Sequence, residues 1–213
     1  MPVRMERWSL SDIVAPPDGR HPDVERRPVS AEETELAARA HAGDLDAFGQ
    51  LVDQYAPQAR RVARAVLGNI DDGDDAAQDG FLSALKNLGR YDPSRPFGPW
   101  LMRIVANAAV DRRRRKKVRA VETLSPTLPS RGPGPASETD RRAMMDTLDR
   151  ALKKLPERQR LAVTLFDVEG YAHAEIAEMM NVPQGTVRSD VFHARRALRS
   201  ALKPWQEWKE EML

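Results

Sequence analysis

The chain has 213 residues, of which 41% are hydrophobic and 31% are charged, a composition that permits a packed core and one or two domains. It contains no cysteine, which excludes a disulfide scaffold, thiol catalysis and zinc sites with cysteine ligands. No apolar run approaches the ~18 residues of a membrane-spanning helix, and residues 1–28 lack the apolar core of a signal peptide. We therefore expect a cytoplasmic protein.

The formal net charge is only +2, but this average hides an uneven distribution. Residues 91–120 carry a net charge of +7 and residues 141–203 a net charge of +4, whereas residues 1–90 carry −5. The sequence therefore contains two basic segments in acidic surroundings, and each is a candidate for binding a polyanion.

Four helices are predicted in the first half of the chain. Residues 1–29 hold five prolines without an apolar period, and we expect them to be disordered. Ser30 and Glu33 form a capping-box pattern that opens the first helix, which ends near Gly43. Asp44 can cap the second helix, which has one continuous apolar face.

Proline and glycine residues mark the remaining boundaries of this half. Pro57 is expected to kink the second helix, and Gly68 to end it. A third helix is predicted from about Asp74 to Leu88, and a loop rich in proline and glycine follows it. The fourth helix is predicted to begin near Pro99 and to finish in the basic run DRRRRKKVR.

The second half begins with a segment typical of a linker and is otherwise helical. Residues 120–137 hold four prolines and two glycines, which predicts a flexible connection. Four helices are then expected, at about 138–154, 156–168, 172–180 and 184–202, followed by a tail at 204–213. The predicted fold is all-α, with two small helical domains at 30–119 and 138–203.

The strongest local motif is AHAEIAEMMNVPQGTVRSDVFHARRAL, which has the pattern of a helix-turn-helix. Asn181 lies where the chain must turn, and asparagine tolerates left-handed backbone geometry well. Pro183 prevents the first helix from continuing. The second helix buries residues spaced three or four apart and leaves other faces basic, which suits insertion into the major groove of DNA. The alternative is an ordinary helical hairpin with a solvated basic face.

One apolar residue on the exposed side of this second helix favours DNA binding. Phe192 lies beside Val191 but on a different face, and a phenyl ring there can contact a thymine methyl group.

A run of six basic residues, from Arg112 to Lys117, covers every side of the fourth helix for nearly two turns. No packed core accepts such a run, so it must face either solvent or phosphate. Aromatic residues near it could stack on unpaired bases. Trp100 is in phase with the apolar face and is expected in the core, whereas Tyr91, in the loop, is the freer candidate.

The remaining polar clusters do not predict a catalytic or metal site. The aspartates between Asp71 and Asp79 lack the spacing of a calcium-binding loop, and more simply match the positive end of the third helix. The four histidines have no metal-ligand spacing, and no nucleophile–base pair stands out. We expect no enzyme, no metal and no cofactor.

The order of these motifs resembles the extracytoplasmic-function (ECF) group of bacterial sigma factors, in the sigma-70 family. AFGQLVDQYAPQARRVA, DDAAQDGFLSAL and FGPWLMRIVANAAVDRRRR resemble the family's region 2. LKKLPERQRLAVTLFDVEGYAHAEIAEMMNVPQGTVRSDVFHARRAL resembles its region 4. The resemblance implies a protein that binds core RNA polymerase and directs initiation at promoters with particular −10 and −35 elements. Family members commonly have an anti-sigma factor, so one is expected as a further partner.

The resemblance also assigns roles to individual residues. The polymerase-binding surface, which docks on the clamp helices of the β′ subunit, would consist of Asp75, Gln78, Asp79, Phe81 and Leu82. The helices at 143–168 would meet the β flap. The −10 element would be bound by Tyr91, Trp100, Arg103, Asn107, Arg112, Arg113, Arg114, Arg115 and Lys116. The −35 element would be read by Thr186, Arg188, Ser189, Phe192, His193 and Arg196.

The sequence departs from the family pattern at four of these motif positions. Asp79 stands where glutamate is usual, and His193 replaces a frequent arginine. Gly80 lies within a helix, where glycine costs about 1 kcal/mol relative to alanine. Asp190 lies where a neutral or basic residue is common, and a carboxylate near phosphate is unfavourable unless it accepts a hydrogen bond from cytosine.

Two other readings compete with a sigma factor. A LuxR-type transcription regulator would share the helix-turn-helix but leaves DDAAQDGFLSAL and the basic fourth helix unexplained. A sigma-mimicking adaptor that binds an anti-sigma factor would have no use for six consecutive basic residues, and usually carries a receiver domain, which is absent from this sequence.

Overall fold

A computed structural model of the chain describes residues 30–120 and 136–211, with side chains at 30–116 and 143–203. The expected disorder of residues 1–29 and most of the expected linker lie outside the described residues. Throughout the described ranges every regular element is a helix, in agreement with the all-α prediction. No described helix is long and apolar enough to cross a membrane.

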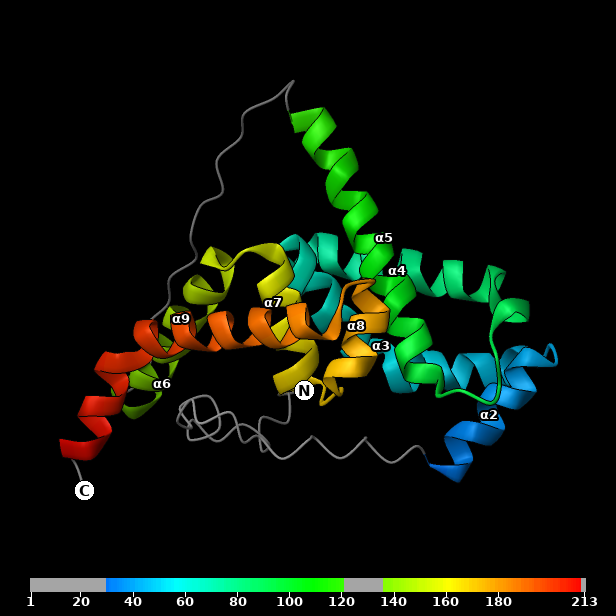
Figure 1. The fold of residues 1–213 in the computed structure, drawn as a ribbon, viewed down its shortest axis with the longest axis horizontal. Helices are drawn as coiled ribbons and strands as arrows, with labels where there is room; N and C mark the ends of the chain where they lie inside the picture. Colours follow the sequence, from blue (N-terminus) through cyan, green and yellow to red (C-terminus); the bar gives the residue numbers. More distant parts are fainter. Residues whose placement is uncertain (1–29, 121–135, 212–213) are drawn as a thin grey trace.

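The first half is built from four α-helices and one short 3₁₀ turn (Figure 1). In chain order these are α2 (Ala31–His41), α3 (Leu45–Leu67), α4 (Ile70–Lys86), η1 (Leu88–Arg90) and α5 (Phe97–Ala120). Helices α3, α4 and α5 pack on one another around a core that contains Leu51, Val62 and Val105. The end of α5 projects away from the rest of the molecule (Figure 1).

Local signals in the sequence explain where these helices begin and end. The Ser30 hydroxyl accepts a hydrogen bond from the Glu33 amide at 3.0 Å, and the Asp44 carboxylate accepts from the first amides of α3. Gly68 ends α3 in the left-handed conformation, with φ of 79°. Pro57 lies inside α3, and the helix continues past it to Leu67 without a break.

Two helices begin earlier than predicted, by four and two residues. The third helix begins at Ile70, not near Asp74, because the Asn69 side chain accepts from the Asp72 amide at 2.9 Å and caps an earlier turn. The next helix begins at Phe97, which places Pro99 in its first turn, where proline is tolerated.

The second half contains four α-helices and a π-helical segment (Figure 1). These are α6 (Ala136–Lys154), α7 (Glu157–Val163), the π-helical η2 (Thr164–Val168), α8 (His173–Met180) and α9 (Gln184–Glu211). As predicted, Asn181 adopts a left-handed conformation between α8 and α9, with φ of 52°. Helix α9 continues nine residues beyond the predicted end at 202, so the segment predicted as a tail begins as helix.

The two halves do not lie apart: they share a hydrophobic core. One continuous cluster of buried residues joins Leu51 and Val62 of the first half to Leu165, Ile176 and Met179 of the second. Helix α3 packs against α7 and η2, and α5 packs against α8. The sequence predicted both helical domains but not this packing between them.

Polar contacts tie the same interface together. The Arg61 guanidinium donates to the Glu169 carboxylate at 2.6 and 2.9 Å. Arg160 of α7 donates to the carbonyl oxygens of Ala65 and Val66, which belong to the last turn of α3. Because the last carbonyls of a helix have no partner within it, Arg160 acts as a cap supplied by the other half of the molecule.

Candidate nucleic-acid interface and the acidic face of α4

The helix-turn-helix formed by α8 and α9 presents one face of α9 to solvent. Val187, Val191 and Ala194 are buried against the rest of the second half. The candidate residues for reading bases lie on other faces, because the helical period of 3.6 residues separates them from the buried positions. Exposed on α9 are Arg188, Ser189, Phe192, His193 and Arg196, and Thr186 is half-buried.

Among the described side chains of α9, Phe192 is the one large apolar residue that is exposed. Its side chain is 47% exposed, and its ring forms a T-shaped contact with the His193 ring at a centroid distance of 5.4 Å. An aromatic pair on an otherwise polar and basic helix face is chemically suited to contact base edges and thymine methyl groups.

Asp190 does not belong to this face, which corrects the expectation that its carboxylate would lie near DNA. The residue is buried, and both of its carboxylate oxygens accept hydrogen bonds from the Arg158 guanidinium of α7, at 2.6 and 3.2 Å. The hydrogen bond to Asp190 raises the pKa of Arg158, and the negative charge of Asp190 raises it further. Asp190 therefore joins α7 to α9, and no carboxylate is exposed on α9 between residues 184 and 203, where its side chains are described.

The basic residues of α5 differ widely in their availability. Arg103 and Asn107 are exposed in the first half of the helix, and Arg114, Arg115 and Lys116 are exposed near its end. Arg112 and Arg113 are half-buried and ion-paired. Arg113 pairs with Glu157 at the start of α7, which is a contact between the two halves of the chain.

The loop tyrosine expected to be free for base stacking is not free in this structure. Tyr91 is buried, and its hydroxyl donates to the Arg95 carbonyl at 2.5 Å. Its ring packs against those of Phe97 and Trp100, with centroid distances of 5.3 and 5.1 Å. Burial, with the nearby charges of Glu33 and Asp92, raises the pKa of Tyr91 to about 12. Trp100 is half-buried against the same core, as expected from its phase.

A groove between the two halves borders the first part of α5. Trp100 and Arg103 line a cavity of about 190 Å³ together with Glu178 of α8. Across it, Arg95 donates to Glu178 at 2.5 Å. In this arrangement α8 lies beside the residues that the sequence associates with the −10 element.

The acidic face of α4 is partly exposed. Asp75 and Gln78 are exposed, Leu82 is 51% exposed, and Asp79 is half-buried. Phe81 is turned inward and packs on the hydrophobic core, so it supports this face from behind. Leu85 was not among the predicted polymerase-binding residues. It lies one turn beyond Leu82, is 37% exposed and extends the apolar part of the stripe.

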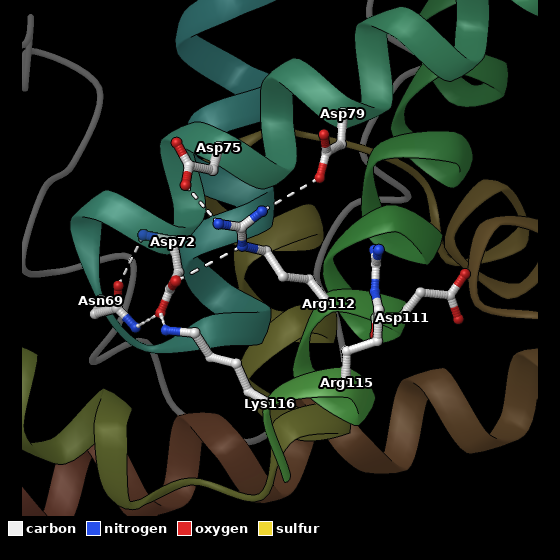
Figure 2. Close-up of polar contacts among 8 residues, drawn as sticks. All are labelled: Asn69, Asp72, Asp75, Asp79, Asp111, Arg112, Arg115 and Lys116. Carbon is white, nitrogen blue, oxygen red and sulfur yellow. Dashed lines mark hydrogen bonds and ion pairs between the residues drawn. The ribbon is translucent and has the colours of Figure 1, made fainter. Parts of the chain in front are cut away.

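Sequence reasoning also missed the buried centre of the acidic cluster. Asp72 accepts hydrogen bonds from its neighbours Asn69 and Lys116, and lies 3.6 Å from Arg112 (Figure 2). Burial would raise the pKa of Asp72, but the hydrogen bonds from Lys116 and Asn69 and the charges of Lys116 and Arg112 outweigh it and hold the pKa below its usual value. The only signal in the sequence was the surplus of aspartate over cations in α4. Within the described ranges, no three histidine or acidic side chains are placed to hold a metal ion.

Comparison with known protein families matches both halves. Residues 51–119 match the model of sigma-70 region 2, and residues 145–198 match a model of sigma-70 region 4. The first match covers α4 and α5, and the second covers the helix-turn-helix. The acidic face of α4 and the basic helix α5 therefore lie in the first matched segment, and the exposed face of α9 lies in the second.

Individual relatives agree with this assignment. The chain is 39% identical to the ECF RNA polymerase sigma factor SigM of Mycobacterium tuberculosis over 80% of this chain and 84% of that protein. It is 32% identical to the ECF RNA polymerase sigma factor SigW of Bacillus subtilis over 76% and 91% of the two chains.

Two solved structures have a fold similar to that of this chain. The structure of CnrH in complex with the cytosolic domain of CnrY matches with a TM-score of 0.59 and 30% identity, over 81% of this chain and 98% of that one. The fold is also similar to that in the co-crystal structure of RpoE with the anti-sigma factor NepR from Bartonella quintana, with a TM-score of 0.62 and 23% identity over 73% and 96%. The chain thus belongs to the sigma-70 family, as an RNA polymerase sigma factor of the ECF group.

Proposed function

We propose that this sigma factor binds core RNA polymerase and directs initiation at promoters whose −35 element is read by the exposed face of α9. The observation that carries the proposal is the row of exposed residues at 186–196 of α9, which holds no exposed carboxylate because Asp190 is turned inward. Arg188 is the cation of this row that lies nearest the start of α9. Arginine is the side chain most often used to recognise guanine, through two hydrogen bonds in the major groove.

The −10 element is assigned to the outer surface of α5. Arg103, Asn107, Arg114 and Arg115 are exposed there and can reach phosphate or bases. Phosphate contacts provide affinity and base contacts provide selection, so promoter binding should weaken steeply as salt is raised.

Polymerase binding is assigned to the stripe on α4. Asp75, Gln78, Asp79 and Leu82 combine negative charge with an exposed apolar patch, which suits the clamp helices of the β′ subunit. The helices at 143–168 would meet the β flap. Each contact is expected to be weak alone, and the chain joining the two halves makes the second contact intramolecular.

The family and its neighbours also support an anti-sigma partner. CnrH was solved with the cytosolic domain of CnrY, and this chain matches 98% of that CnrH chain. We expect the present sigma factor to be held inactive by such a partner, to act in the cytoplasm and to associate with the nucleoid as part of the holoenzyme. It would use no metal or cofactor and would perform no covalent chemistry of its own.

Neither competing reading accounts for both halves. A LuxR-type regulator has no use for the acidic stripe of α4 followed by the basic helix α5. An adaptor that only mimics a sigma factor does not need the exposed cations of α9 and α5.

Replacing Arg188 with alanine should lower run-off transcription from a cognate promoter by about 5- to 150-fold, the loss expected for one bidentate base contact of about 1–3 kcal/mol. The promoter is found beforehand by run-off transcription from a promoter library with wild-type sigma factor and purified core polymerase. Binding of Arg188→Ala to core polymerase alone should be unchanged, since Arg188 lies on α9 and is not part of the proposed docking stripe on α4.

The double variant Asp75→Lys, Gln78→Ala serves as the reciprocal control. It should lose core binding in a pull-down and therefore lose transcription from every promoter. Failure of wild-type sigma to start transcription on any promoter would refute the proposed function, and loss of core binding by Arg188→Ala would refute the division of roles between α9 and α4.

A further inference from the structure

Arg112, in the run of six basic residues, is held by carboxylates rather than presented to solvent. Its guanidinium pairs with Asp75, lies 3.3 Å from Asp79 and lies 3.6 Å from Asp72, all on α4 (Figure 2). These aspartates occupy successive turns of one face of α4, because their spacing of three and four residues matches the helical period. A single side chain of α5 thus spans the whole acidic face of α4.

The exposure of the side chains separates Arg112 from its neighbours in the run. The side chain of Arg112 is 26% exposed and that of Asp72 is 11% exposed, whereas Arg114 and Arg115 belong to the exposed class. Lys116, one turn after Arg112, also donates to Asp72. The basic run therefore has one side that is neutralised by α4 and another that is available to phosphate.

The carboxylates on either side of Arg112 remain accessible from outside. The side chains of Asp75 and Asp79 are 59% and 45% exposed. Like charges one turn apart on a helix repel each other, and a guanidinium between them removes that repulsion while fixing both side chains in place. The planar fork of arginine can bond two carboxylates at once, which the ammonium of lysine does with less geometric control.

We propose that Arg112 is a positioning residue for polymerase binding, and not a ligand of promoter DNA. It holds Asp75 and Asp79 in the orientation in which they meet a basic surface of the polymerase. This inference rests on the proposed docking role of α4. It removes Arg112 from the set of residues assigned to the −10 element and makes α5 part of the polymerase-binding structure.

The test compares Arg112→Gln with Arg114→Gln, which removes the same charge from the exposed side of the same helix. Binding to core polymerase is measured without DNA, by the fluorescence anisotropy of labelled sigma factor. Arg112→Gln should weaken core binding by about five- to tenfold, which is the size of the net contribution of one hydrogen-bonding partner. Arg112→Lys should recover part of it, and Arg114→Gln should bind core polymerase like the wild type but lose promoter affinity.

A double-mutant cycle distinguishes positioning from a general loss of structure. In a chain that already carries Asp75→Asn and Asp79→Asn, Arg112→Gln should have no further effect on core binding, because neither of the two docking carboxylates remains to be positioned; Asp72, which still pairs with Arg112, is buried and is not part of the docking surface. The same five- to tenfold loss in that background would overturn the proposal, as would normal core binding by Arg112→Gln combined with reduced promoter binding.

The docking role of α4 is tested separately within the same set of variants. If Asp75→Asn with Asp79→Asn binds core polymerase normally, the proposed docking surface is wrong. If that variant loses binding and Arg112→Gln does not, the docking surface stands and the positioning role is wrong.

Discussion

At the scale of single residues, the direction in which a charged side chain points decides what it can do. Asp190 and Arg188 are two positions apart on α9, which places them on different sides of the helix. The first is buried and paired with Arg158, and the second is exposed. The sequence places both residues in the helix that would enter the groove of DNA. Only the position of α7 shows that Asp190 pairs with another helix of the protein and does not face DNA.

Replacing Arg158 with alanine should lower the free energy of unfolding by about 1–3 kcal/mol, because it leaves the buried Asp190 carboxylate without its partner. Urea denaturation followed by circular dichroism measures this loss. Arg188→Ala removes an equal charge from the exposed face and should change stability by less than about 0.5 kcal/mol. Equal stability of the two variants would contradict the structural role of the Arg158–Asp190 pair.

At the scale of the helices, α4 and α5 approach each other so closely that a side chain does not fit at one crossing point. Gly80 is buried there, and a β-carbon added to it would lie 2.8 Å from Cγ2 and 3.0 Å from Cα of Val105. From the sequence alone, Gly80 is only a departure from the family pattern that lowers the helix propensity of α4. The structure explains it, since this close contact brings Arg112 within reach of the aspartates of α4.

Gly80→Ala should therefore destabilise the protein by about 1–3 kcal/mol through overpacking, although alanine is the better helix former. Gly49→Ala is the matched control, because Gly49 is exposed within α3 and has no heavy atom within 4 Å of an added β-carbon. That variant should be more stable than the wild type by up to about 1 kcal/mol. Thermal unfolding of the two variants should shift in opposite directions, and a stabilising effect of Gly80→Ala would refute the tight crossing.

At the scale of the whole molecule, the two halves form one packed body. Arg160 caps the end of α3, Glu169 pairs with Arg61, and α8 lies against α5 beside the groove that contains Arg103. The segments that bind the −10 and −35 elements must lie apart along the DNA. The packing of the two halves must therefore either persist when the protein binds polymerase or open at that step. The charged contacts between the halves are the points at which it can be tested.

Removing Arg160 and Glu169 together, as Arg160→Ala with Glu169→Ala, should loosen the contact between the halves. The chain has no cysteine, so cysteines introduced at the exposed Gln50 and Ser200 can carry a specific pair of fluorophores. Energy transfer between them should fall in the double variant. Lys153→Ala breaks an ion pair with Asp149 inside α6 and should leave energy transfer unchanged. Unchanged transfer in both variants would show that these contacts do not hold the halves together.

The features that could be predicted from the sequence are those encoded by neighbouring residues. The caps at Ser30 and Asp44, the stop at Gly68 and the left-handed turn at Asn181 all follow from local chemistry. The exposed face of α9 also follows, because the apolar residues spaced three and four apart identify the buried side. The late start predicted for α4 has a local cause as well, since the cap is Asn69 and not one of the aspartates.

The roles that the sequence could not predict depend on residues far apart in the chain. Tyr91 is buried by rings from α5, Arg112 is paired with aspartates more than 30 positions earlier, and Arg160 reaches carbonyls of α3. A run of cations has the same appearance in the sequence whether or not an acidic helix lies beside it. The sequence by itself therefore determined the helices, their faces and the family, because these depend on short-range periodicity and motif order. Only the tertiary structure decided which charges are free for a partner, because that depends on which helices are packed together.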